Sequence, residues 1–199
     1  QYRAIGLFKG VYTPDDSEHF TRGHLTDKDG SEISAVVLGR VLSLMNKHLE
    51  MNTPHLWIVY PRSRESNSLH LQIAGIWEPS TLKSTANIKK DNSLLLSDDL
   101  PEGDNYFSIR GELIYTRPEK HSLVLKIRPK AKKNGKRARA FKLPIQGNIP
   151  VEHLRKFVSL DVRREAQQLH VDEYEIISSM KSQSVQNKSF TLKTIKKGD

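Results

Sequence analysis

The sequence predicts a mainly β protein that consists of two related halves, each with the element order β-β-β-α-β-β. Two observations support this prediction. Short segments rich in strand-forming residues alternate with turn-forming clusters along most of the 199 residues, which is the pattern of an all-β domain. In addition, residues 64–71 (RESNSLHL) match residues 164–171 (REAQQLHV) at an offset of 100. This period is too long for a solenoid repeat, so we expect two domains.

The first half contains five predicted strands and one helix. The dipeptide Asp29-Gly30 separates two strand-like segments and is typical of a type I′ hairpin turn, because both central residues of that turn need positive φ. Apolar residues then take up helical spacing, and Pro54 closes this helix. The strands are expected at residues 4–12, 20–26, 31–38, 56–60 and 69–77, and the helix at residues 40–50.

The second half repeats this order. Asn134-Gly135 is another hairpin signal, and Pro150 suits the first turn of a short helix. The strands are expected at residues 106–116, 122–128, 137–145, 159–163 and 169–177, and the helix at residues 150–157. We therefore predict a first domain at residues 1–78, a polar linker at 79–105, a second domain at 106–178 and a basic, flexible tail at 179–199.

This order of elements resembles the oligonucleotide-binding (OB) fold, a five-stranded Greek-key barrel with a helix between its third and fourth strands. The resemblance covers residues 5–78 and 106–178 and rests on the order of the elements. The predicted helix is long in the first half and short in the second. The resemblance implies two OB-like five-stranded barrels that bind nucleic acid. The sequence also resembles uncharacterised basic proteins of cyanobacteria, which implies no function. A single larger β-barrel and a pair of SH3-like barrels are the alternative folds.

The composition narrows the classes of partner and site. The net charge of +9 favours binding to phosphate, to an anionic membrane or to an acidic protein. The absence of cysteine excludes a disulfide scaffold, a thiolate metal site and a cysteine nucleophile, and it favours a reducing, cytoplasmic location. No apolar stretch approaches the roughly 20 residues that span a bilayer, and no signal-peptide pattern begins the sequence.

The positive charge is concentrated in residues 126–142 (KIRPKAKKNGKRARAFK), here called the basic segment, which holds nine lysines and arginines and no acidic residue. Residues two apart on a strand share a face, so a hairpin turning at Asn134-Gly135 would present a row of cations to a phosphate backbone. Tyr115 and Phe141 are candidates for base stacking. The predicted nucleic-acid-binding residues are Tyr115, Arg117, Lys126, Arg128, Lys130, Lys132, Lys133, Lys136, Arg137, Arg139, Phe141 and Lys142.

Arg62 and Arg64 form a secondary candidate site beside the aromatic residues Trp57, Tyr60 and Trp77. The alternative is that the two tryptophans are core residues. The eight histidines show no zinc-binding spacing, so we expect no metal and no cofactor.

We predict a non-enzymatic protein that binds RNA or single-stranded DNA. The alternatives are an adaptor that binds protein, or a subunit of a larger nucleoprotein complex. A basic hairpin tip that serves only solubility or localisation is also open. A nuclease built from Asp161, Glu165 and Asp172 is the enzymatic alternative, although no motif places these carboxylates together.

Overall fold

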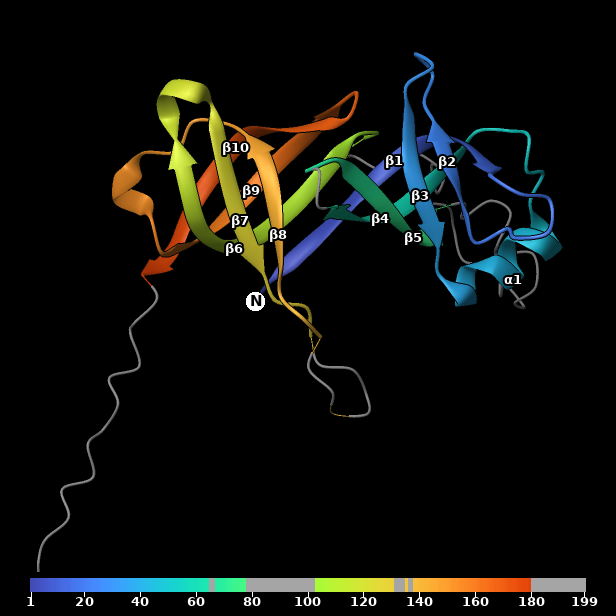
Figure 1. Ribbon diagram of the computed structural model, residues 1–199, viewed down its shortest axis with the longest axis horizontal. Coiled ribbons are helices and arrows are strands. Elements are labelled where there is room, and N and C mark those ends of the chain that lie inside the picture. Colours follow the sequence, from blue (N-terminus) through green and yellow to red (C-terminus); the bar gives the residue numbers. More distant parts are fainter. Residues whose placement is uncertain (65–66, 78–102, 131–134, 136–137, 180–199) are drawn as a thin grey trace, which may run out of the picture.

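The computed structural model describes residues 1–64, 67–77, 103–130, 135 and 138–179. Within these residues, ten strands form one continuous sheet that closes twice, once in each half (Figure 1). The first half contains β1 (Arg3–Pro14), β2 (Arg22–Thr26), β3 (Glu32–Val37), α1 (Gly39–His48), β4 (His55–Ser63) and β5 (Leu69–Ile76). The second half contains β6 (Tyr106–Arg117), η2 (Pro118–Lys120), β7 (Ser122–Ile127), β8 (Phe141–Gln146), η3 (Val151–His153), β9 (Lys156–Glu165) and β10 (Gln168–Ser179).

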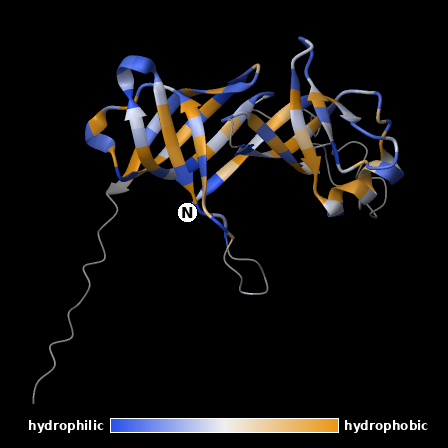
Figure 2. Ribbon diagram, in the orientation of Figure 1, coloured by the Kyte–Doolittle hydropathy of each residue, from blue (hydrophilic) through white to orange (hydrophobic). Residues whose placement is uncertain are grey.

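The first barrel closes through β1, which pairs antiparallel with both β2 and β4. β2 pairs with β3, β4 pairs with β5, and β3 lies parallel to β5, which completes the ring. Apolar and polar residues alternate along the strands (Figure 2), so one face of each strand lines a core that includes Phe8, Trp57 and Leu71. α1 packs Val41 and Met45 against this core. Among the described residues, no helix is long and apolar enough to cross a membrane.

The second barrel has the same topology. β6 pairs antiparallel with β7 and β9, β7 with β8, and β9 with β10. β10 lies parallel to β8, where His170 is opposite Gln146. Its core includes Phe107, Leu125 and Val162. The prediction of two five-stranded OB barrels is therefore confirmed.

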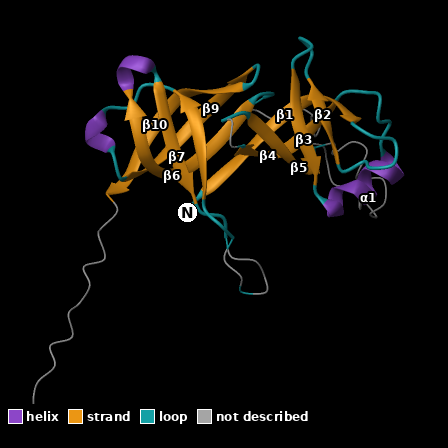
Figure 3. Cartoon of the chain, viewed as in Figure 1, coloured by secondary structure: helices purple, strands orange, loops and turns teal. Residues whose placement is uncertain are grey.

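The first strands of the two halves pair with each other and join the barrels. β1 runs antiparallel to β6 from Arg3, opposite Arg110, to Gly6, opposite Phe107. Glycine is required at position 6 because a Cβ atom there would lie 2.1 Å from the Cδ1 atom of Phe107. The two barrels thus lie side by side in one hydrogen-bonded sheet (Figure 3).

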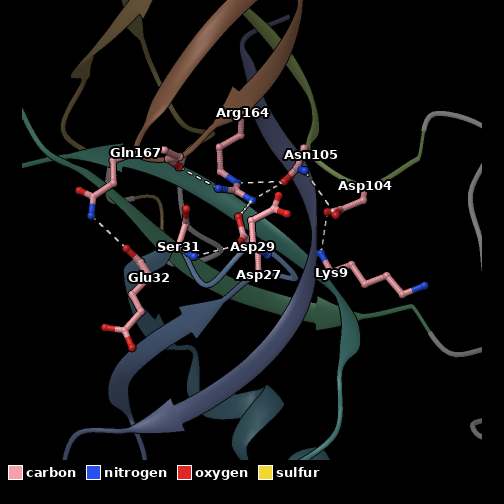
Figure 4. A network of polar contacts seen from close by, with 10 residues as sticks. Lys9, Asp27, Asp29, Ser31, Glu32, Asp104, Asn105, Arg164 and Gln167 are labelled. Carbon is pink, nitrogen blue, oxygen red and sulfur yellow. Dashed lines mark hydrogen bonds and ion pairs between the residues drawn. The ribbon is translucent and has the colours of Figure 1, made fainter.

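A buried ion pair forms a second contact between the barrels (Figure 4). The Arg164 side chain, in β9, is 1% exposed and donates from Nη2 to Oδ2 of Asp27, in the turn between β2 and β3, at 2.8 Å. Arg164 also donates to Oδ1 of Asn105 and to the carbonyl oxygen of Ala166. Its guanidinium carbon lies 4.4 Å from the centre of the Phe8 ring. The charge of Arg164 is therefore fully compensated.

Asp27 is held as a carboxylate by this arrangement. Burial alone would raise the pKa of Asp27, but hydrogen bonds from Arg164 and from the backbone N–H groups of Ser31 and Asp29 hold that pKa below its usual value. Both backbone donors lie 2.9 Å from Oδ1 of Asp27. The same carboxylate therefore closes the β2–β3 turn and binds the second barrel.

The end of the predicted linker also binds the first barrel. The backbone N–H of Lys9 donates to Oδ1 of Asp104 at 2.7 Å, and the backbone N–H of Asn105 donates to the carbonyl oxygen of Leu7 at 3.1 Å. Gln167 reaches back across the contact and donates from Nε2 to the carbonyl oxygen of Glu32 at 3.0 Å. Residues 79–102 of the predicted linker and 180–199 of the predicted tail lie outside the described residues.

The predicted helix at residues 150–157 is wrong. The structure has a single 3₁₀ turn, η3, and β9 already begins at Lys156. Tertiary hydrogen bonds to β6 explain the difference, because Thr116 donates to the carbonyl oxygen of Ile149 and the N–H of Arg155 donates to the carbonyl oxygen of Leu113. With both ends held on β6, the segment has no length for a longer helix.

Candidate nucleic-acid interface

Four of the predicted binding residues lie on one surface of the second barrel. The inward side chains of β6, β7 and β8 are buried, as with Leu125 of β7 and Leu143 of β8, which lie opposite each other. The residues between them point outward, because successive side chains of a strand alternate between its faces. We call this surface the outer face. It consists of Tyr115, Arg117, Ser122, Val124, Lys126, Lys142, Pro144 and Gln146.

A β-bulge brings Tyr115 to the outer face. Tyr115 matches Tyr12 of the first half in sequence, yet Tyr12 is 1% exposed and Tyr115 is 39% exposed. The register of β6 against β7 shifts between Leu113 and Tyr115, and such a shift moves the following side chains to the opposite face. Thr116 is therefore the buried residue at this place, and the tyrosine ring is free to meet a ligand.

Two lysines lie directly opposite each other on the outer face. Lys126 of β7 pairs with Lys142 of β8, and like charges in this arrangement destabilise a sheet. Glu112 lies opposite Lys126 on its other side, but it is 8% exposed and forms an ion pair with Arg155 at 3.5 Å. This pair therefore concentrates positive charge on the outer face.

The strands of the basic segment are shorter than predicted. β7 ends at Ile127 and β8 begins at Phe141, so Arg128, Lys130 and Arg139 do not lie on a strand. Pro129 explains the end of β7, because proline has no N–H to donate to a neighbouring strand. Gly135 has φ 75°, as a turn requires. Four predicted binding residues fall outside the described part of the chain: Lys132, Lys133, Lys136 and Arg137.

Phe141 does not share the outer face with Tyr115. It lies opposite Ile127 at the end of the second barrel, and its ring contacts Arg62 of the first barrel. The guanidinium carbon of Arg62 lies 4.1 Å from the centre of the Phe141 ring and 5.8 Å from that of Tyr60. The structure thus brings together one residue of the main predicted site and one of the secondary site.

The other member of the secondary site, Arg64, lies over the first barrel and donates to Oγ of Ser34 at 3.0 Å. His70 lies opposite Arg62 in the sheet. Burial first, and then the charges of Arg64 and Arg62, lower the pKa of His70, so this histidine adds no charge at neutral pH. Trp57 is fully buried and donates to a backbone carbonyl, as a core residue does.

A cleft of about 380 Å³ opens between the barrels beside Arg62. The described residues that line it include four cations and three aromatic rings, with no carboxylate. They come from the start of the chain, from β4 and from both ends of the basic segment. The lining residues are Gln1, Tyr2, Arg3, Ala4, Ile5, Tyr60, Arg62, Ile127, Arg128, Pro129, Lys130 and Phe141. The sequence did not predict this cleft, because its parts are far apart along the chain.

The three carboxylates of the enzymatic alternative have separate partners. Asp161 accepts a hydrogen bond from Tyr106 at 2.8 Å, and Asp172 forms an ion pair with Arg163 at 2.8 Å. Glu165 lies 3.7 Å from His170. In the part of the chain that the structure describes, no group of three or more histidine, aspartate or glutamate side chains could hold a metal ion.

Two protein-family models match the chain, one on each barrel. Residues 4–84 match the model described as PatR RNA-binding protein, N-terminal OB-fold domain. Residues 109–178 match the model described as cyanobacterial OB-fold-like RNA-binding domain, C-terminal. The order of the two matches agrees with the order of the barrels. No curated protein matches the sequence.

Proposed function

The chain belongs to the tandem OB-fold nucleic-acid-binding proteins of cyanobacterial type, and from this premise we propose that it is a non-enzymatic RNA-binding protein whose outer face grips the phosphate backbone. The observation that carries the proposal is the Lys126–Lys142 pair beside the exposed ring of Tyr115. OB barrels bind oligonucleotides across their second and third strands, and here these strands are β7 and β8. The lysines supply the charge, and Tyr115 supplies a stacking surface.

The corresponding surface of the first barrel supports a lesser role. On β2 and β3, Arg22, His24 and Glu32 point outward. His24 is within 2.8 Å of Asp15, and Glu32 adds a negative charge. This mixed surface attracts phosphate less strongly than the outer face of the second barrel, so we assign the main electrostatic contact to the second barrel.

Replacement of both lysines tests the assignment. In the Lys126→Gln/Lys142→Gln variant, RNA affinity should fall, and the slope of log K against log salt should become shallower by about 1.4, because two phosphate contacts to a single strand are lost. The measurement is fluorescence anisotropy with oligouridylate at several salt concentrations. A matched control, Lys28→Gln/Lys47→Gln, removes the same charge from two exposed lysines of the first barrel and should leave most of the slope unchanged.

Equal effects of the two variants would show that RNA senses only net charge and would contradict the assignment to the outer face. Failure of the wild-type chain to bind any RNA at low salt, together with stable co-elution with a protein, would contradict the proposed function and favour an adaptor.

A further inference from the structure

We propose that the cleft between the barrels binds one unstacked nucleotide of the RNA strand that crosses the outer face, with Arg62 as its main contact. This inference rests on the proposed RNA-binding function and names the ligand more closely, as single-stranded RNA. The cleft volume of about 380 Å³ lies within the roughly 300–1,000 Å³ typical of small-ligand sites. Its cations suit a phosphate, and its aromatic rings suit a base.

The state of Arg62 is the first argument. Its side chain is half-buried, and burial lowers its pKa. Its hydrogen bond within the described residues runs from Nη1 to the neighbouring carbonyl oxygen of Pro61 at 2.8 Å. Arg164, the buried arginine at the contact between the barrels, has the carboxylate of Asp27 and further acceptors. Burying a charge is costly unless it is paired, and no ion pair of Arg62 with a carboxylate is found among the described residues, so its guanidinium is suited to an anionic ligand.

The aromatic surroundings of Arg62 are the second argument. The guanidinium lies against Phe141 and near Tyr60, and Tyr2 lines the same cleft. RNA-binding proteins hold splayed-out bases by stacking them on aromatic rings or on arginine guanidinium planes. The cleft offers both kinds of surface within one contact region.

The continuity of the hollows is the third argument. A shallow hollow of about 340 Å³ on the second barrel is lined by Lys126, Lys142 and Phe141, among others. Phe141 also lines the cleft, so the lysine pair and the cleft meet at this ring. Arg128 and Lys130 line both the cleft and a further hollow of about 540 Å³. A single strand can therefore pass from the outer face into the cleft without leaving a basic surface.

This geometry selects unpaired RNA. A base in a duplex is paired and stacked, so it cannot enter a cleft without being extruded. The outer face alone would bind a duplex backbone by charge, because phosphate contacts carry no information on pairing. The cleft is the feature that makes the protein prefer a single strand.

Photo-crosslinking of the wild-type chain tests the inference directly. The probe is an oligouridylate of about 12 nucleotides, within the site size of OB folds, that carries 4-thiouridine, and the cross-linked peptides are mapped by mass spectrometry. We expect cross-links at Tyr115 and also in the cleft, at Tyr60, Phe141 or Tyr2. Cross-links at Tyr115 with none in the cleft would overturn the inference and leave the proposed function standing. Absence of any binding would overturn both.

Variants of Arg62 give the second measurement. Arg62→Met should reduce the affinity for the same probe about tenfold or more, abolish the cleft cross-links and keep those at Tyr115. Arg62→Lys retains the charge but not the planar guanidinium that can stack on a base, so its RNA affinity should lie between those of the wild type and Arg62→Met. The control Arg163→Met removes an arginine that is 54% exposed and paired with Asp172, and it should bind as the wild type does. If Arg62→Met binds and cross-links as the wild type, or if Arg163→Met loses as much affinity, the inference is wrong.

Discussion

Arg163 and Arg164 are neighbours in β9, but their surroundings give them opposite importance for stability. Arg163 is 54% exposed and pairs with Asp172 at 2.8 Å, whereas Arg164 is 1% exposed and pairs with Asp27 at the same distance. An exposed ion pair contributes little, since water and salt screen it. Removal of one partner of a buried pair leaves an uncompensated charge in a poorly solvated place.

We therefore expect Arg164→Met to lower the free energy of unfolding by about 3–5 kcal/mol and Arg163→Met to lower it by about 1 kcal/mol or less. Urea denaturation of the two variants and the wild type, under identical conditions, measures the difference. Similar losses in both variants would mean that the Asp27–Arg164 contact adds nothing specific.

The contribution of the Asp27–Arg164 ion pair to the free energy of unfolding decreases at acidic pH. The pKa of Asp27 in the folded chain is below its usual value, so the pair stabilises the fold fully above the unfolded pKa of about 3.9 and loses this effect as the pH falls through the folded value. At neutral pH the contact between the barrels is therefore at full strength.

At the scale of elements, β1 and β6 show how one inserted residue can make two equivalent strands present the same side chain on opposite faces. The two strands match in sequence and in topology, but the bulge in β6 turns Tyr115 outward while Tyr12 stays in the core. The first barrel thus uses its tyrosine for packing, and the second uses its tyrosine for a surface. A bulge of this kind re-aims a side chain without changing the fold.

The β1–β6 pairing also makes a prediction about glycine. Gly6→Ala would place a Cβ atom 2.1 Å from the Phe107 ring, whereas Gly75→Ala, on β5, would meet nothing closer than Cδ1 of Ile58 at 3.4 Å. We expect Gly6→Ala to cost about 1–3 kcal/mol, as overpacking does. Gly75→Ala should be neutral or stabilising, because alanine reduces the entropy of the unfolded chain. Thermal denaturation compares the two variants, and a stable Gly6→Ala protein would contradict the tight packing at the joint.

The elements that could be predicted from sequence are those set by local pattern. The β2–β3 hairpin at Asp29-Gly30 and the helix near residues 40–50 are confirmed, with α1 at Gly39–His48. The predicted turn type, I′, is wrong, because Gly30 has φ 81° whereas Asp29 has no positive φ. The predicted helix at 150–157 is wrong: Pro150 suits the first turn of a helix, but hydrogen bonds to β6 hold the segment as a single 3₁₀ turn. The strands predicted in the basic segment are too long, because β7 ends at Ile127, just before Pro129.

At the scale of the whole molecule, the contacts between the barrels could not be predicted. Asp27 lies in a turn motif that explains its presence locally, and its partner Arg164 is 137 residues away. Arg62 and Phe141 were assigned to separate sites, and only the arrangement of the barrels brings them into contact. The sequence of the basic segment predicts the positive charge of the candidate site, but the geometry of the site depends on this long-range packing of the barrels.

Because one sheet and one buried ion pair join the barrels, we expect the chain to unfold in a single cooperative transition. Both tryptophans, Trp57 and Trp77, belong to the first half of the chain, so their fluorescence reports on that half alone, while far-ultraviolet circular dichroism reports on both. The two urea curves should coincide, as the two-state test requires. Separate midpoints would show that the barrels unfold independently.

The joint between the barrels has one further property, which is symmetry. Gly6 and Ile109 hold the same place in the two halves, since they pair with Val59 and Leu160 of the corresponding strands β4 and β9. Gly6 in turn faces Phe107, and Ile109 faces Ala4, so the backbone register is two-fold symmetric about the pair of Ile5 and Ser108, while the side chains at its equivalent positions differ. The small residues Ala4 and Gly6 of β1 lie against the large residues Ile109 and Phe107 of β6, so two copies of either strand would not reproduce this packing.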